Sequence, residues 1–245
     1  MKAYEADLAF IHDVGYGDFA KQTSEQLLKL FAKKQIDSGL VVDLGCGSGI
    51  WASKLLDAGY DVLGVDISSE MINLARKAAP KARFVCSSFL DVQLPQCSVV
   101  TSLGECLCYL FDEKNELAAL EKLFRRVYDA LEKGGLFIFD VVTPKVRKRV
   151  GFNKKSFWES DEWSILVEYF AQVDQNDKVW RRGITTFRKV GKLYRRSYEV
   201  HRQRLYKSSE LAPLLRSIGF SVHVVKKYGD YTLLPGRLGF IARKK

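Results

Sequence analysis

The sequence predicts an α/β fold in which a doubly wound, mainly parallel sheet carries a small antiparallel sheet as an accessory. As far as Val142, short apolar runs alternate with amphipathic helices, the pattern of parallel strands joined by helical crossovers. Beyond Pro144 the periodicity changes to two, as in residues 165–172, which is typical of antiparallel strands. The chain has 245 residues, 47% of them hydrophobic, which is enough for one such domain with an elaboration.

The parallel part is expected to open with a helix and then to alternate strands with helices. Gly59 stops the second helix, and Ser68 or Ser69 is a natural N-cap for the third. Apolar residues at steps of three and four between Leu117 and Leu131 define one buried stripe on a long helix. In order, the expected elements are a helix at 18–34, a strand ending at Asp43, a helix at 48–58, a strand ending at Asp66, a helix through Met71 to Ala75, strands at 83–86 and 98–102, the long helix, and a strand at 136–141 that Gly134-Gly135 open.

The accessory part is rich in Trp, Tyr, Phe, Val and Arg, with expected turns at 174–177 and at Gly191. A helix that begins at Ser208 or Ser209 and ends at Gly219 leads into two closing strands, near 220–226 and 237–242. The chain is therefore expected to divide into a core at 1–144 with an N-terminal helix, an accessory sheet at 145–207, and a last helix with closing strands at 208–245.

A glycine-rich turn follows the first apolar run, in the segment Val41-Val42-Asp43-Leu44-Gly45-Cys46-Gly47-Ser48-Gly49. The dinucleotide fingerprint requires glycine at its first, third and sixth positions, but Ile50 occupies the sixth position here. Asp43 also stands two residues before the first glycine, where its charge would repel a pyrophosphate. A carboxylate there suits a nucleoside ligand that carries an ammonium group and no phosphate, and S-adenosylmethionine is such a ligand.

These residues make the chain resemble the class I S-adenosylmethionine-dependent methyltransferases. Residues 43–49 match the first motif of that family, and Gly64-Val65-Asp66-Ile67-Ser68 matches the acidic end of its second strand. The resemblance covers residues 39–142 well and the last two strands loosely. It implies a seven-stranded sheet in the order 3-2-1-4-5-7-6 with strand seven antiparallel, and S-adenosylmethionine as the cofactor.

The resemblance also implies a set of cofactor-binding residues. Gly45 and Gly47 would let the backbone approach the cofactor, Asp43 would orient its amino-acid end, and Asp66 would accept both ribose hydroxyl protons. Helix capping or a surface position is the alternative role for both acids. The chain departs from the family after strand three, where Ser87-Ser88-Phe89 replaces an acid that often holds the adenine. The expected cofactor-binding residues are Tyr16, Asp43, Gly45, Cys46, Gly47, Asp66, Ile67, Met71, Ser88, Phe89, Leu103 and Gly104.

The expected reaction is an in-line methyl transfer to a nitrogen or oxygen of a small molecule, with residues 145–207 as a lid over the acceptor. The catalytic candidates are His12, Tyr109 and His201, and each histidine also has a structural role as its alternative. Tyr16, Glu105 and Asp140 are further candidate pocket groups, and Glu105 can instead serve as a helix N-terminal residue.

Three other functions stay open from the sequence. The net charge is +10, and eleven basic residues stand against Asp177 and Glu199 between Asn176 and Lys207, which indicates either a solvated face or an anion-binding surface. With Trp180, Tyr194, Tyr198 and Tyr206, that surface motivates RNA methylation as the second hypothesis. A non-catalytic adenosyl-binding protein and an NAD(P)-dependent oxidoreductase are the remaining alternatives.

Composition excludes several settings. Apolar runs stay well short of 18 residues, so a membrane span is not expected, and the charged N-terminus is unlike a secretory signal. The five cysteines lie mostly in expected strands or beside the glycine turn, which indicates reduced core residues of a cytoplasmic protein. Cys106 and Cys108 lack a second ligand pair at metal-binding spacing, so no metal is expected.

Overall fold

A computed structural model describes residues 3–15, 17–146, 154–170 and 179–245. Its central sheet has seven strands, in the spatial order β3-β2-β1-β4-β5-β13-β10. Six of them run in the same direction, whereas β13 runs antiparallel to its neighbours β5 and β10. The strands are β1 (Leu40–Leu44), β2 (Asp61–Asp66), β3 (Arg83–Cys86), β4 (Cys97–Ser102), β5 (Leu131–Val142), β10 (Phe220–Val225) and β13 (Arg237–Lys244). Counted along the chain within this sheet, the order is 3-2-1-4-5-7-6, which confirms the prediction.

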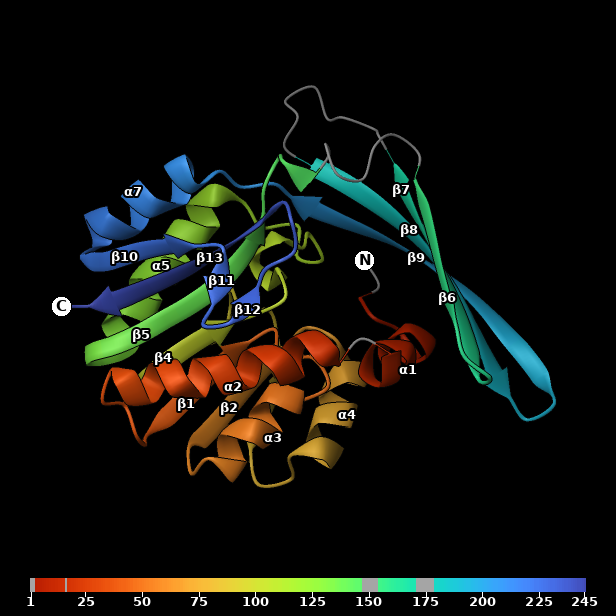
Figure 1. Ribbon diagram of the computed structural model, residues 1–245, viewed down its shortest axis with the longest axis horizontal. Coiled ribbons are helices and arrows are strands. Elements are labelled where there is room, and N and C mark those ends of the chain that lie inside the picture. The colour runs from red at the N-terminus through yellow and green to blue at the C-terminus, as the bar shows by residue number, and fades with distance from the viewer. Residues whose placement is uncertain (1–2, 16, 147–153, 171–178) are drawn as a thin grey trace.

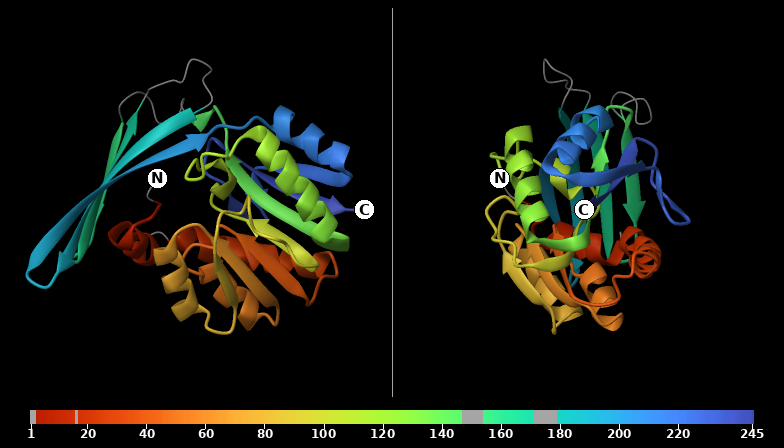
Figure 2. Two further views of the ribbon diagram at one scale, coloured as in Figure 1. Left: turned by 180° about the vertical axis from the view of Figure 1, so that it is seen from behind. Right: turned by 90° about the vertical axis from the view of Figure 1, so that its left-hand side faces the viewer.

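Helices cover both faces of this sheet, as the right-hand view of Figure 2 shows. Successive strand residues point to opposite faces, so Val41 belongs to the apolar layer that includes α2 and α3, whereas Val42 belongs to the layer that includes α5 and α7. Both valines are fully buried, because each face has its own apolar layer. The helices are α2 (Asp18–Lys33), α3 (Ile50–Asp57), α4 (Ser69–Ala78), α5 (Leu117–Ala130) and α7 (Ser208–Ile218).

A separate four-stranded antiparallel sheet projects from the core (Figure 1). Its strands are β6 (Lys155–Glu159), β7 (Trp163–Phe170), β8 (Val179–Val190) and β9 (Leu193–Arg204). The turn expected at Gly191 joins β8 to β9, with the glycine at a φ of 62°. The turn expected at 174–177 lies outside the described residues. The N-terminal helix α1 (Ala6–Gly15) lies between this accessory sheet and the core, where Leu8 and Ile11 pack on the accessory strands.

Three details differ from the expected elements. Helix α1 was not expected over residues 6–15, because its apolar side chains find their partners only on the accessory sheet. Strand β5 begins at Leu131, which already pairs with Cys97, and Gly134-Gly135 lie inside it at a shift of register rather than opening it. Along the chain, β10 and β13 are joined by a segment with two short strands that form a small hairpin. These are β11 (Lys227–Tyr228) and β12 (Tyr231–Thr232).

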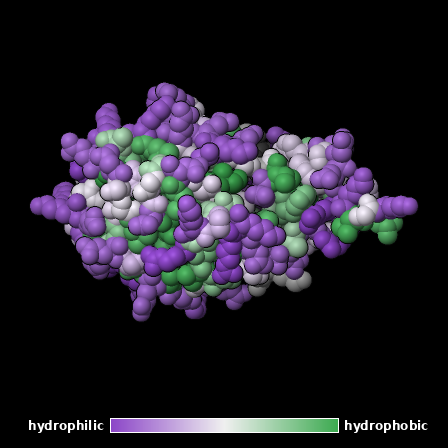
Figure 3. Space-filling model, turned by 90° about the horizontal axis from the view of Figure 1, so that it is seen from below, coloured by the Kyte–Doolittle hydropathy of each residue, from purple (hydrophilic) through white to green (hydrophobic). Residues whose placement is uncertain are grey.

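The sequence also led us to expect a chain without a membrane span, a metal site or disulfide bonds. The face shown in Figure 3 is largely hydrophilic, with hydrophobic atoms in separate patches. In the described part of the chain, no helix combines the length and apolar character needed to cross a membrane. The same residues contain no group of three or more His, Cys, Asp or Glu placed to hold a metal ion. All five cysteines are free thiols.

Candidate active site

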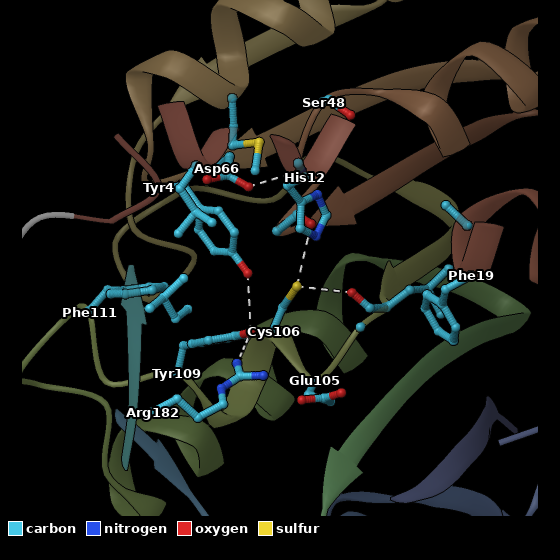
Figure 4. Close-up of a pocket in the computed structure, with 18 of the residues that line it drawn as sticks. Tyr4, His12, Phe19, Ser48, Asp66, Glu105, Cys106, Tyr109, Phe111 and Arg182 are labelled. Carbon is cyan, nitrogen blue, oxygen red and sulfur yellow. Dashed lines mark hydrogen bonds between the residues drawn. The ribbon is translucent and has the colours of Figure 1, made fainter. Parts of the chain in front are cut away.

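A cavity of about 750 Å³ lies between the carboxyl ends of the core strands and the inner face of the accessory sheet. The turn after β1, the end of β2 and the loop after β4 form its floor, whereas β7 and β8 supply an apolar and aromatic wall. Helix α1 contributes Leu8 and His12 from the side. A cavity of this size and lining is typical of a small-molecule site. Figure 4 shows part of it from within.

The three glycines after β1 have different surroundings. A Cβ on Gly45 would lie 2.5 Å from Cys106 Sγ, and one on Gly49 would lie 2.8 Å from Ala75 Cα, so these two glycines allow the chain to pack on itself. A Cβ on Gly47 would meet nothing within 4 Å, and its φ of 53° favours glycine. Gly47 is therefore the glycine of this turn that leaves open room for a ligand.

Asp66 ends β2 with a fixed carboxylate. Its Oδ2 accepts the backbone N–H of Gly47 at 2.9 Å, and its Oδ1 accepts the N–H of Ser68 at 2.9 Å. A carboxylate has more acceptor positions than these backbone bonds occupy, which leaves room for a ligand hydroxyl. Ser68 caps α4 by accepting the N–H of Met71 at 3.2 Å, so the capping function belongs to Ser68 and not to Asp66.

Asp43 is a buried carboxyl group at the end of β1. It is 3% exposed, and Thr101 Oγ1 donates a hydrogen bond to its Oδ1 at 2.7 Å. The pKa of Asp43 is raised to about 7, mainly by burial and to a lesser extent by the nearby Asp66, with the Thr101 hydrogen bond acting against both. A cation in the cavity would favour the ionised form of this carboxyl group.

The loop after β4 supplies the acid that the sequence lacks after β3. Ser88 Oγ donates to Asp112 Oδ2 at 2.6 Å, and both residues line the cavity. Ser88 also accepts the N–H of Leu90 at 3.2 Å. Asp112 was not predicted as a site residue, because only the folded loop brings it beside Ser88. Its carboxylate places a hydrogen-bond acceptor at this end of the cavity.

Tyr4, Tyr109 and Arg182 form a hydrogen-bonded row that leads from the neighbourhood of Asp66 to the accessory sheet, visible in Figure 4. Arg182 Nη2 donates to Tyr109 Oη at 2.6 Å, and the hydroxyls of Tyr109 and Tyr4 are 3.2 Å apart. Burial raises the pKa of Tyr4 and of Tyr109, so both phenols carry their protons at neutral pH. Tyr109 was a predicted catalytic residue, whereas Tyr4 and Arg182 were not singled out.

Glu105 is engaged in an ion pair and hydrogen bonds rather than free in the cavity. It pairs with Arg237, and Gln203 Nε2 donates to its Oε2 at 2.8 Å. Asp140 holds the same loop, since its carboxylate accepts the backbone N–H groups of Gly104 at 2.8 Å and Glu105 at 3.0 Å. Asp140 is fully buried beneath the loop and is not among the described cavity-lining residues, contrary to the expectation that it faces the pocket.

The two candidate histidines occupy different positions. His12 lines the cavity beside Tyr4, at 5.2 Å between ring centroids, and burial lowers the pKa of His12 to about 4. His201 was expected in the pocket, but it is fully buried behind Tyr4 and Tyr109 and is not among the described lining residues. Its Nε2 lies 3.0 Å from Glu199 Oε2. The N-terminal segment covers His201 in a way that strand position alone does not reveal.

The structure brings most of the predicted site residues to one cavity. Tyr16 lies outside the described residues. The predicted residues that line the cavity are His12, Asp43, Gly45, Cys46, Gly47, Asp66, Ile67, Met71, Ser88, Phe89, Leu103, Gly104 and Tyr109. The aromatic wall of Trp158, Trp163 and Tyr169 was missed, although its alternate spacing on two strands was a usable signal.

Comparison with known proteins identifies the family. A family model described as a methyltransferase domain matches residues 41–135, which contain the glycine turn and Asp66. The protein YqeM of Bacillus subtilis (strain 168), named as a methyltransferase, is 26% identical to this chain over 200 residues. The match covers 80% of this chain and 78% of YqeM. Residues 41–135 therefore form a methyltransferase domain, and the chain is an S-adenosylmethionine-dependent methyltransferase.

Solved structures show the same fold for the whole methyltransferase. An S-adenosylmethionine-dependent methyltransferase from Clostridium acetobutylicum ATCC 824 aligns with a TM-score of 0.80 and 22% identity, over 96% of this chain and 97% of that one. The sugar N-methyltransferase KedS8 from Streptoalloteichus sp ATCC 53650 also gives 0.80, with 15% identity, over 100% and 96% of the two chains. The fold similarity therefore includes the accessory sheet as well as the core.

The residues of the cavity fit S-adenosylmethionine, the cofactor of this family. Gly47 leaves an open cradle beside the backbone, where a Cβ would protrude. Asp66 and Asp43 place two carboxyl groups at adjacent strand ends, and the turn between them presents no cationic side chain that would suit a pyrophosphate. Burial also raises the pKa of Cys106 well above its usual range, so this thiol is not a thiolate nucleophile.

Proposed function

We propose that this methyltransferase transfers a methyl group to a nitrogen or oxygen atom of a small molecule. The observation that carries the proposal is a single cavity of about 750 Å³, in which the acidic cofactor end and the aromatic acceptor end are continuous. A cavity walled by Trp163, Tyr169 and Ile165 suits a small molecule that is largely enclosed. KedS8, named as a sugar N-methyltransferase, shares this arrangement of core and accessory sheet, which supports the small-molecule assignment.

In this proposal Asp66 binds the ribose hydroxyls, and Asp43 faces the amino-acid end of the cofactor. Asp112, held in place by Ser88, accepts a hydrogen bond from the adenine amino group. When bound, S-adenosylmethionine supplies a methyl group attached to a positively charged sulfur. Residues 145–207 then serve as the acceptor lid, and α1 closes the side of the cavity. Holding acceptor and methyl group in line in a water-excluded cavity can contribute about 7–11 kcal/mol to lowering the barrier.

His12 and Tyr109 act on the acceptor in this proposal, whereas His201 does not, since it is covered by Tyr4 and Tyr109. Because the pKa of His12 is about 4, its imidazole is neutral at neutral pH and offers a proton-accepting nitrogen. A general base is optional for an amine that binds neutral and is needed for a hydroxyl acceptor. Tyr109, held by Arg182, positions the acceptor as a protonated phenol.

RNA methylation is less well supported by the positions of the aromatic residues that motivated it. Trp180 and Tyr206 are buried, at 8% and 2% exposure, so neither can stack on a base. Tyr194 and Tyr198 are exposed, but on β9 they alternate with Glu199 and His201, which face the N-terminal segment. An RNA strand bound on these two tyrosines would lie on the face of the sheet opposite the cavity.

The experiment measures transfer of a labelled methyl group from S-adenosylmethionine to panels of small amines and alcohols, and in parallel to tRNA and rRNA fragments. We expect label only in the small-molecule panels, a kcat that falls in His12→Ala, and unchanged affinity for S-adenosylhomocysteine in that variant. Label in RNA, with binding that weakens steeply as salt rises, would favour the second hypothesis. Cofactor binding without transfer to any acceptor panel would favour a non-catalytic protein, and displacement of S-adenosylhomocysteine by NAD would favour an oxidoreductase.

A further inference from the structure

Arg182 places a guanidinium group in the acceptor end of the cavity. It lies on β8 between Trp180 and Ile184, and all three side chains line the cavity because they share one face of the strand. The guanidinium carbon lies 5.6 Å from the ring centroid of Tyr109 and 5.9 Å from that of Trp180. These rings and the Tyr109 hydroxyl fix the position of the cation.

No carboxylate among the described residues forms an ion pair with Arg182. Glu105, the carboxylate that acts electrostatically on Arg182, is already paired with Arg237 and accepts a hydrogen bond from Gln203. Glu199 accepts the backbone N–H groups of Tyr4 and Glu5. Arg182 Nε is buried without a hydrogen-bond partner. A cation withdrawn from water in this way is costly unless an anion accompanies it.

The remaining charges of the cavity give it two electrically distinct ends. Asp43, Asp66 and Asp112 make the cofactor end acidic, which suits a cationic ligand. At the acceptor end, the charges of Glu105 and Arg237 cancel, which leaves two lining cations, the exposed Lys154 and the buried Arg182. Arg182 is the one withdrawn from water. Guanidinium groups stay protonated at any working pH, and their planar donors match the geometry of carboxylate and phosphate oxygens.

We propose that the methyl acceptor carries an anionic oxygen group, a carboxylate or a phosphate, which the Arg182 guanidinium binds. The anion would complete the row formed by Tyr4, Tyr109 and Arg182, and it would hold the acceptor with its reactive atom toward the acidic end. The aromatic wall of Trp163 and Tyr169 encloses the apolar part of the same molecule. This inference rests on the proposed function, because it names the acceptor class for that reaction.

The test uses three probes of similar shape on protein saturated with S-adenosylhomocysteine: benzoate, phenyl phosphate, and the neutral benzamide. Calorimetry on the wild-type protein should show at least one anion binding about tenfold or more tightly than benzamide. The stronger of the two anions distinguishes a carboxylate acceptor from a phosphate acceptor. Equal affinity for all three probes in the wild-type protein would overturn the inference without any variant being needed.

Variants then assign the preference to the residue. Arg182→Gln should reduce anion affinity to that of benzamide and leave S-adenosylhomocysteine affinity unchanged, and Arg182→Lys should retain part of the preference. Arg196→Gln is the matched control, because it removes an exposed cation from the same sheet outside the cavity. An anion preference that survives in Arg182→Gln would overturn the inference. Failure of the wild-type protein to bind S-adenosylhomocysteine would instead contradict the proposed function.

Discussion

Gly47 donates its backbone N–H to Oδ2 of Asp66 at 2.9 Å, so the turn after β1 and the end of β2 hold each other in place. The carboxylate is oriented before any ligand arrives, and the glycine presents open space beside it. This pair links the two sequence motifs that identified the family. It also makes the cofactor site sensitive to change at either residue.

Replacing Asp66 with Ala should weaken S-adenosylhomocysteine binding by about 1.5–3 kcal/mol, because charge-assisted hydrogen bonds to the ribose are lost. Isothermal titration calorimetry measures this difference directly. Asp91→Ala is the control, since Asp91 is an exposed acid paired with Lys114 and does not line the cavity. Equal affinities for wild type and Asp66→Ala would remove Asp66 from the cofactor site.

Gly47→Ala should abolish most cofactor binding, whereas Gly59→Ala should leave it intact. Both glycines have a positive φ, 53° and 90°, and a Cβ on either meets nothing within 4 Å. Each substitution should therefore lower the free energy of unfolding by a similar amount, about 1–2 kcal/mol for a left-handed residue. Only Gly47 lines the cavity. Thermal melts and calorimetry on the pair separate backbone strain from ligand contact, and matching losses of affinity would contradict the assignment.

The affinity for S-adenosylhomocysteine should rise between about pH 6 and pH 8. The pKa of Asp43 is raised to about 7 by burial, so this carboxyl group becomes ionised across that interval and then attracts the ligand's ammonium group. Calorimetry at several pH values measures the trend. The trend should flatten in Asp43→Asn, and the same slope in that variant would show that another group is responsible.

Asp43 and Asp140 should each lower the stability of the ligand-free protein as pH rises from about 4 to about 7, whereas His12, whose pKa is lowered to about 4, acts in the opposite direction below about pH 6.5. A folded-state pKa of about 7 for Asp43 and for Asp140, against 3.8 without burial, means that the folded state binds more protons in this window. Asp7 contributes in a separate, more acidic window, because Arg195 lowers its pKa. Asp43→Asn should show a smaller fall of melting temperature between pH 5 and pH 8 than wild type. A parallel fall in both proteins would contradict this origin.

Glu199→Ala should loosen the N-terminal segment over the cavity. Glu199 accepts the N–H groups of Tyr4 at 3.0 Å and Glu5 at 2.9 Å, which attach the segment leading into α1 to the accessory sheet. Hydrogen exchange at residues 4–12 should become faster, and the dissociation rate of S-adenosylhomocysteine should increase. Glu168→Ala, which removes an ion pair with Lys155 on the same sheet, is the control and should change neither.

The cofactor end of the site could be predicted because its determinants are local in sequence. The glycine turn and Asp66 each follow an apolar strand directly, and neighbouring parallel strands bring both to one edge of the sheet. The acceptor end could not be predicted in the same way. Arg182 meets Tyr109 across 73 positions, and Tyr4 meets Glu199 across 195, so both contacts depend on how the accessory sheet and α1 dock.

For the fold too, features that are local in sequence could be predicted, whereas contacts between distant segments could not. Alternating strands and helices predicted the central sheet and its order, since each element carries its own periodicity. His201 is an example of a position that periodicity does not predict correctly. Its place on β9 predicts a residue that faces the cavity, but Tyr4 and Tyr109 cover it. Asp112 is a site residue that the sequence did not reveal, because nothing in its immediate neighbours indicates that its loop reaches Ser88.

A crystal structure of this methyltransferase with S-adenosylhomocysteine tests the central claim most directly. The ribose hydroxyls should lie within hydrogen-bond distance of Asp66, the amino-acid end should point toward Asp43, and the sulfur should face the row of Tyr4, Tyr109 and Arg182. Density for the nucleoside outside the crevice between β1 and β2, or a pyrophosphate held at Gly47, would contradict the account.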